Sequence, residues 1–159
     1  MEKFNKLKKL VSKKSSSMNF HQVTNNIFRS ARLTKNELQN VKDKHNIRTV
    51  INLEDDPAAI KAEQEAAKSL GLKFISKPLS NKTQPSDKTI DDILKELTNS
   101  ENFPILVHCH AGRERTGLIV GFYRVLVEGK DPDAAYQEML DKGFRPQATV
   151  LDDYFKAKV

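Results

Sequence analysis

The chain has 159 residues, a length that suits one domain with a sizeable hydrophobic core. Its single cysteine excludes an internal disulfide framework and suits a reducing compartment, and no apolar run approaches the roughly 18 residues that span a membrane. No apolar segment of the secretory type follows the N-terminus, so we expect a cytoplasmic protein.

The net charge of +6 is concentrated at one end of the chain. Residues 1–17 hold six lysines and one glutamate, whereas the rest has 21 basic and 20 acidic residues. We therefore expect a basic tail over 1–17, a single domain over 18–159, and no nucleic-acid partner. Two interpretations of the tail stay open: a solvated, disordered terminus, or a basic amphipathic helix that contacts anionic membranes weakly.

Strands and helices alternate along the predicted domain. A strand covers Ile27–Arg29, and a capping-box pattern at Thr34 and Glu37 begins a helix that runs to about Lys44. Further elements follow from β-branched runs, cap residues and turn formers: a strand at 48–53, a helix at 57–70, a strand at 72–77, a helix from Ser86 or Asp87 to Leu97, a strand at 104–108, a helix ending near Gly129, a helix from Asp131 to about Leu140, and a last helix at 147–158.

This alternation predicts an α/β fold with a central, mostly parallel sheet flanked by helices. The run "PILV" (Pro104–Val107) is apolar throughout, as strands buried on both faces are. We therefore expect it at the centre of the sheet.

Residues 108–117, "HCHAGRERTG", place the only thiol between that strand and the following helix. Free backbone N–H groups and the helix dipole converge at such a junction and attract anions. Gly112 permits a tight turn, and Arg115 can hold two phosphate oxygens with its forked guanidinium. A thiolate at Cys109 in this positive field is a nucleophile at neutral pH, so the segment predicts a phosphate cradle with a nucleophile at its floor.

The pattern C-x5-R-[ST] after an apolar strand and His108 resembles the cysteine-dependent phosphatases. This superfamily contains protein tyrosine phosphatases, dual-specificity phosphatases and their inositol-phosphate relatives. "HCHAGRERTG" matches HCxxGxxR[ST]G at every fixed position, and the broader resemblance to compact bacterial and fungal dual-specificity-type members runs from about Phe20 to Pro146. Because Arg115 and Thr116 suit phosphate chemistry, sulfur transfer by a rhodanese-like cysteine is disfavoured.

The resemblance implies a two-step reaction without metal or cofactor. Cys109 attacks phosphorus to form a phosphocysteine, and water then hydrolyses it. Thr116 donates its hydroxyl to the leaving sulfur, and His108 orients the cysteine. The oxygens of the transferring group are held by Arg115 and by the backbone N–H groups of the loop, which comprises His110, Ala111, Gly112, Arg113, Glu114 and Arg115.

The usual proton donor of this superfamily, an aspartate about thirty residues before the cysteine, is replaced by Asn81 in this chain. Two acids are possible substitutes. Glu114 occupies a loop position that is acidic in one bacterial branch (C-x-A-G-K-D-R), although it could instead be a salt-bridged rim residue. Asp87 begins a helix and could instead be its N-cap. We prefer Glu114.

The variable loop residues His110 and Arg113 stand where inositol-lipid phosphatases have two lysines. Extra cations favour a substrate with several phosphates, so we place inositol polyphosphate slightly ahead of phosphoprotein. The alternative is a non-catalytic module that reads phosphorylated partners. Arg29 is either an ordinary surface residue or a support for the loop, and Arg145 is interpreted as solvated.

Overall fold

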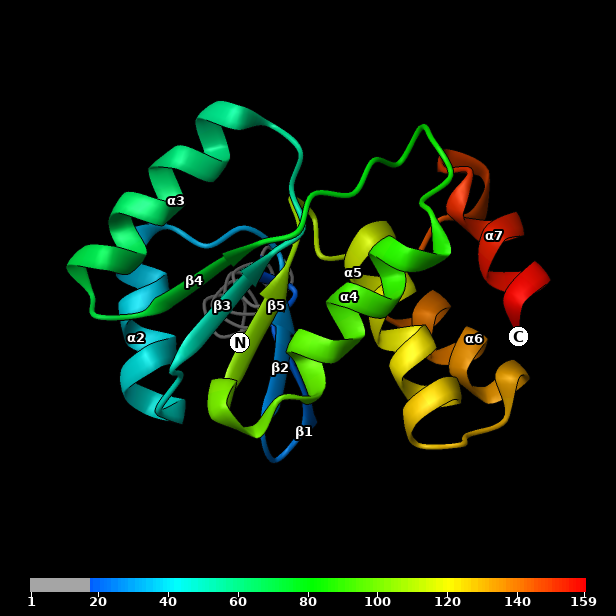
Figure 1. The fold of residues 1–159 in the computed structure, drawn as a ribbon, viewed down its shortest axis with the longest axis horizontal. Coiled ribbons are helices and arrows are strands. Elements are labelled where there is room, and N and C mark those ends of the chain that lie inside the picture. The colour runs from blue at the N-terminus through cyan, green and yellow to red at the C-terminus, as the bar shows by residue number, and fades with distance from the viewer. Residues whose placement is uncertain (1–17) are drawn as a thin grey trace, which may run out of the picture.

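The computed structural model describes residues 18–159, so the predictions for the tail at 1–17 lie outside the described residues. A five-stranded sheet in the order β1-β2-β5-β3-β4 forms the middle of the fold (Figure 1). Its strands are β1 (His21–Thr24), β2 (Ile27–Ser30), β3 (Thr49–Asn52), β4 (Lys73–Ser76) and β5 (Ile105–His108). Every pairing is parallel except that of β1 with β2, so the predicted α/β class is confirmed. Strand β1 was not predicted, because "HQVT" has no apolar run.

Six helices surround the sheet in residues 18–159: α2 (Lys35–His45), α3 (Pro57–Ser69), α4 (Asp87–Thr98), α5 (Glu114–Phe122), α6 (Pro132–Asp141) and α7 (Leu151–Lys158). Their predicted caps are confirmed: Thr34 and Glu37 form a capping box, and Ser86 rather than Asp87 is the N-cap of α4. None of the described helices is both long and apolar enough to cross a membrane.

Two segments depart from a regular α-helix. The turns after α5 are π-helical (η2, Tyr123–Val127), and a short 3₁₀ turn after α4 (η1, Ser100–Asn102) leads into β5. The helix predicted for 147–158 is wrong at its start. Residues Pro146–Ala148 form a separate 3₁₀ turn (η3), Thr149 is extended, and α7 begins only at Leu151.

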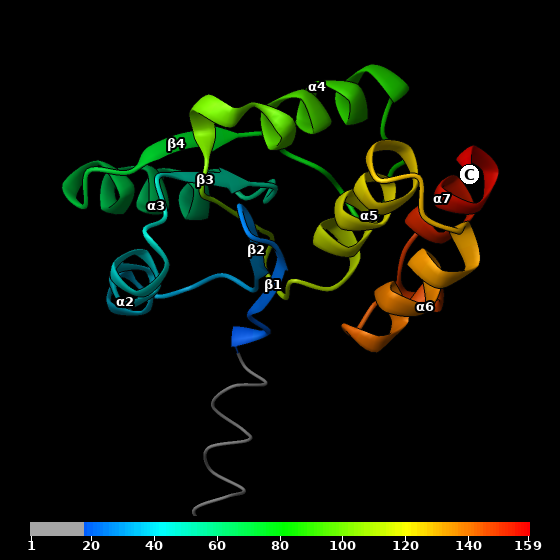
Figure 2. The same cartoon turned by 90° about the horizontal axis from the view of Figure 1, so that it is seen from below.

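The sheet separates two hydrophobic layers. Helices α2 and α3 lie on one face, while α4 and α5 lie on the other with α6 and α7 outside them (Figures 1 and 2). Adjacent strand residues divide between the layers as the pleat requires: Leu106 packs with α2 and α3, whereas Ile105 and Val107 pack with α4 to α7.

Strand β5 lies at the centre, between β2 and β3, as the run "PILV" predicts. All four of its residues are buried. Because β2, β5 and β3 are parallel, their carboxyl ends share one edge of the sheet. The loop that follows His108 therefore emerges between the loops that follow β2 and β3, which can both contact it.

Candidate active site

The loop between β5 and α5 holds the cysteine in the interior. Cys109 is 2% exposed. Gly112 has φ +69°, and its Cα lies so close to β2 that an added Cβ would be 2.6 Å from the carbonyl carbon of Ser30. Only glycine suits both conditions, so the loop packs directly on the backbone after β2.

The carbonyl groups of five consecutive residues of this segment accept hydrogen bonds from surrounding groups. Their donors come from the loops after β2 and β3 and from side chains: Leu53 N to His108 O (2.8 Å), His108 Nδ1 to Cys109 O (3.1 Å), Arg32 N to His110 O (2.9 Å), Asn19 Nδ2 to Ala111 O (3.4 Å) and Gly112 O (3.1 Å), and Arg29 Nη2 to Gly112 O (3.0 Å).

A planar trans peptide directs the N–H of each residue opposite to the carbonyl of the residue before it. The N–H groups of residues 110–113 are therefore directed away from those donors. Within residues 18–159, no backbone carbonyl accepts a hydrogen bond from them. Together with the first turn of α5, they form a set of free donors of the kind that binds an oxyanion.

Arg115, in the first turn of α5, is held by one of its nitrogens. Its Nη1 donates to Asp55 Oδ1 at 2.9 Å and to the carbonyl of Leu79 at 3.2 Å. Its Nε is buried and has no partner among the described residues. The guanidinium is thus anchored from the loops after β3 and β4, while its Nε edge is free to bind a ligand.

His108 is buried and is held between two acceptors. Its Nε2 lies 2.6 Å from Glu63 Oε1, and its Nδ1 lies 3.1 Å from the Cys109 carbonyl oxygen. Burial alone would lower the pKa of His108, but the hydrogen bond and charge of Glu63 outweigh it and raise that pKa above 6.5. Two acceptors at the two ring nitrogens match a protonated ring that orients Cys109.

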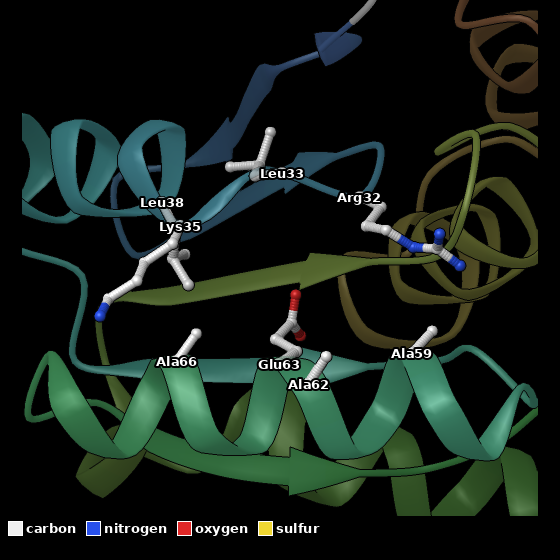
Figure 3. A pocket seen from close by; sticks show the side chains of 8 residues that line it. All are labelled: Arg32, Leu33, Lys35, Leu38, Ala59, Ala62, Glu63 and Ala66. Atoms are coloured by element: carbon white, nitrogen blue, oxygen red, sulfur yellow. The ribbon is translucent and has the colours of Figure 1, made fainter.

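Glu63 reaches His108 from the layer that contains α2 and α3, on the other side of the sheet from α5. It projects from α3 into a pocket of ≈ 280 Å³ between α2 and α3, whose walls include Leu33, Leu38 and Ala62 (Figure 3). Its Oε1 also accepts from Asn52 Nδ2 at 3.0 Å. The base of the cysteine loop therefore connects through Glu63 to the face of the sheet that α2 and α3 cover.

Arg29 is a buried cation beneath the loop rather than a surface residue. It is 2% exposed, and burial lowers its pKa to about 10. Its Nη2 donates to Gly112, whereas its Nε and Nη1 have no partner among residues 18–159. The hydroxyl of Thr116 is also buried and has no partner in the described part of the chain, so it is available to a group in the cradle.

The two candidate acids have different surroundings. Glu114 is 2% exposed, and Arg145 Nε donates to its Oε1 at 2.7 Å, so Arg145 is not simply solvated. Asp87 accepts from Tyr154 Oη at 2.8 Å and from Lys158 Nζ at 3.1 Å, and these two bonds lower its pKa. The structure thus ties Glu114 to the loop after α6 and ties Asp87 to α7.

Other residues of the motif lie at the mouth of the loop. His110 and Arg113 are exposed, and Arg113 lies against Gly143, where an added Cβ would be 3.0 Å from its Cγ. The loop that contains Asn81 is joined to the start of α7, because the Asn81 carbonyl accepts from Val150 N at 3.1 Å. Residues 18–159 contain no cluster of three His, Cys, Asp or Glu side chains that could hold a metal ion.

Three residues of this site were not identified from the sequence: Asp55, Glu63 and Asn19. The acidic run "EDD" directly after β3 was a usable signal for Asp55, since polar residues at the carboxyl ends of parallel strands face the ligand edge of a sheet. Glu63 and Asn19 had no such signal, because they reach the loop from α3 and from the segment before β1.

A thiol at the floor of free N–H donors, beside an arginine, defines a site for a tetrahedral oxyanion, and comparison with known proteins agrees with this class. Residues 16–131 match the model of the Tyrosine phosphatase family, so the chain belongs to that family. It is 28% identical over 138 residues to the dual specificity protein phosphatase TpbA of Pseudomonas aeruginosa, covering 86% of this chain and 60% of the relative. It is 32% identical over 114 residues to the inositol diphosphatase DSP4 of Arabidopsis thaliana, covering 67% and 55%. The chain thus spans 55–60% of the length of these relatives.

Two solved structures of phosphatases have the same fold as this chain. The crystal structure of P. aeruginosa TpbA superposes with a TM-score of 0.76 at 23% identity, covering 90% of this chain and 86% of that one. The core catalytic domain of the PP-IP phosphatase SIW14 from S. cerevisiae superposes with a TM-score of 0.75 at 24% identity, covering 88% and 84%. The similarity therefore extends from the cysteine loop to the whole sheet and its helices.

Proposed function

We propose that this chain is a cysteine-dependent phosphatase that hydrolyses phosphate monoesters through a phosphocysteine intermediate. One observation carries the proposal: the buried thiol of Cys109 begins a loop whose N–H groups, like the nearby Nε of Arg115, have no acceptor among residues 18–159. Donors that are left without acceptors lower the stability of the folded chain, whereas a bound oxyanion supplies acceptors for them.

In the first step the Cys109 thiolate attacks phosphorus, a P–S bond forms, and the ester P–O bond breaks. The leaving oxygen takes a proton from a carboxylic acid. Arg115 and the N–H groups of the loop stabilise the charge of the transferring group. In the second step water attacks phosphorus and gives a proton to the carboxylate left by the first step, the P–S bond breaks, and the hydroxyl of Thr116 donates a hydrogen bond to the departing sulfur. The products are the alcohol and inorganic phosphate, and the thiolate is restored.

We propose Glu114 rather than Asp87 as the acid. Glu114 adjoins Arg115 in the chain, and its buried carboxyl group accepts from Arg145 Nε at 2.7 Å. Both oxygens of Asp87 are engaged by Tyr154 and Lys158, and its pKa is lowered, so it is a poor donor. Arg145, 53% exposed, is free to leave Glu114 for a substrate phosphate.

Leaving-group dependence tests this choice. Glu114→Gln should slow the hydrolysis of an inositol or alkyl phosphate by roughly 10²-fold or more. It should slow the hydrolysis of nitrophenyl phosphate, an aryl phosphate, far less, since nitrophenolate leaves without full protonation. Asp87→Asn is the matched control and should change the rate of hydrolysis of both substrates little. An unchanged tungstate affinity shows that the cradle is intact. The reverse pattern would assign the proton to Asp87.

The substrate that we propose is an inositol polyphosphate, or else a phosphoprotein. The exposed side chains of His110 and Arg113, with the guanidinium of Arg145, support a ligand with several phosphates. Among the relatives, DSP4 is named an inositol diphosphatase, and TpbA, named a dual specificity protein phosphatase, has been crystallised with pTyr. Both classes of substrate are therefore represented in the family.

Phosphate release from a panel of inositol polyphosphates, phosphopeptides and an aryl phosphate tests the proposal. Cys109→Ser should abolish turnover while still binding tungstate, because a hydroxyl of ordinary pKa is not ionised at neutral pH. If the wild-type chain binds tungstate but releases phosphate from none of these esters, it is instead a module that reads phosphorylated partners.

A further inference from the structure

One residue outside the motif makes two contacts to the phosphate-binding loop. Asn19 lies just before β1, more than ninety residues from the loop in sequence. Its Nδ2 lies 3.1 Å from the carbonyl oxygen of Gly112 and 3.4 Å from that of Ala111. The same nitrogen lies 3.1 Å from the carbonyl oxygen of Lys142, after α6. The amide of Asn19 therefore joins the segment before β1, the loop and the end of α6 at one point.

The orientation of this amide is determined by its other end. Asn19 Oδ1 lies 2.8 Å from His21 Nε2 and accepts a hydrogen bond from it. Burial, together with the charges of Lys142 and Arg29, lowers the pKa of His21. Because an amide oxygen can only accept, Nε2 of His21 is the donor in this contact. With Oδ1 directed at His21, the NH₂ group faces the three carbonyls, and only a nitrogen can donate to them.

These contacts decide which way two peptide groups of the loop face. In the part of the chain that the structure describes, no donor other than Asn19 bonds to the Ala111 carbonyl, whereas the Gly112 carbonyl accepts from both Asn19 and Arg29. Because a peptide group is planar, a carbonyl that is held outward keeps the next N–H directed inward. Asn19 thus controls the N–H groups of Gly112 and Arg113.

We propose that Asn19 is a positioning residue of the phosphate-binding loop: its side-chain amide keeps the carbonyls of Ala111 and Gly112 directed away from the cradle. The proposal rests on the proposed function, in that the cradle binds a phosphate. A rotation of either peptide group would replace an attractive N–H with a repulsive carbonyl oxygen beside the anion. The same rotation would weaken the positive field of the N–H groups around Cys109.

Asn19→Asp tests this arrangement. It preserves size but removes the NH₂ donor and directs a carboxylate oxygen at three carbonyls. The probe is tungstate, a tetrahedral oxyanion whose binding requires no turnover, measured by calorimetry. We expect about tenfold weaker tungstate binding, the effect of losing one or two oriented hydrogen bonds. We also expect the pH profile of Cys109 alkylation by iodoacetamide to move to higher pH.

Asn46 provides the matched control. Like Asn19 (φ +43°) it has a left-handed backbone (φ +57°), but it caps α2 and is exposed. Asn46→Asp should leave both measurements unchanged. If Asn19→Asp does not fold, Asn19→Gly, which suits the positive φ and lacks the amide, provides the same comparison.

Two kinds of failure are distinguishable. A wild-type chain that binds tungstate but hydrolyses no ester refutes the proposed function, and the tungstate affinities of the variants still test Asn19. Tungstate affinity within about twofold of wild type, with an unchanged alkylation profile, refutes the role of Asn19 even if the variant unfolds at lower temperature.

Discussion

Replacement of Gly112 by alanine tests the close contact between the cysteine loop and β2. Gly112 has φ +69°, and an added Cβ would lie 2.6 Å from both the carbonyl carbon and the oxygen of Ser30 and 2.7 Å from the nitrogen of Ala31. These are backbone atoms of a buried strand end, so they cannot turn aside as a flexible side chain would. Either β2 or the loop must move.

The expected cost has two parts. An alanine in the left-handed region costs about 1–2 kcal/mol, and forcing a methyl group into a packed backbone contact costs about 1–3 kcal/mol more. Gly112→Ala should therefore lower the free energy of unfolding by about 2–5 kcal/mol. Because relief of the clash moves the loop away from Ser30, it should also misplace the N–H groups and reduce kcat strongly.

Gly129 is the matched control. Its φ is +68°, but nothing lies within 4 Å of an added Cβ. Gly129→Ala should cost only the backbone part, about 1–2 kcal/mol, and leave kcat unchanged. Urea denaturation and initial rates on an aryl phosphate measure both effects. If the two variants are equally stable and equally active, the contact between the loop and β2 does not constrain the site.

Three further perturbations test separate parts of the site. Asp55→Ala removes the carboxylate that anchors Nη1 of Arg115 and should weaken tungstate binding by about tenfold, while an unchanged affinity would show that Arg115 orients itself. Glu63→Gln should change the pH dependence of stability. Glu63 raises the pKa of His108 above 6.5, so the contact between them stabilises the folded chain fully below pH 6.5, and this stabilisation is lost as pH rises through the raised pKa. The urea midpoints of the variant should lack this decline. Deletion of residues 1–17 should leave the rate of hydrolysis of a soluble aryl phosphate unchanged, and a large loss of rate would show that the segment contacts the domain. If this basic segment binds membranes, its deletion should also reduce salt-sensitive association with anionic vesicles.

Local features of the sequence determined most of the elements and the chemical core of the site. Thr34 with Glu37, and Ser86, signalled helix starts because capping depends on residues a few positions apart. The uninterrupted apolar run before His108 signalled the central strand, and the spacing of Cys109 and Arg115 signalled the phosphate loop. Strand β1 was not predicted, because three of its four residues are polar. It forms through its antiparallel pairing with β2.

Only the tertiary structure decided what surrounds this core. The partners of the loop come from four distant segments: Asn19 before β1, Arg29 on β2, Asp55 after β3 and Glu63 on α3. The pairing of Arg145 with Glu114 and of Tyr154 with Asp87, which separates the two candidate acids, likewise joins residues 31 and 67 positions apart. Such contacts depend on strand order and on how helices pack across the sheet, and no local pattern of residues encodes them. The chain thus carries Cys109 and Arg115 in one short motif, whereas the orientation of that motif is a property of the whole fold.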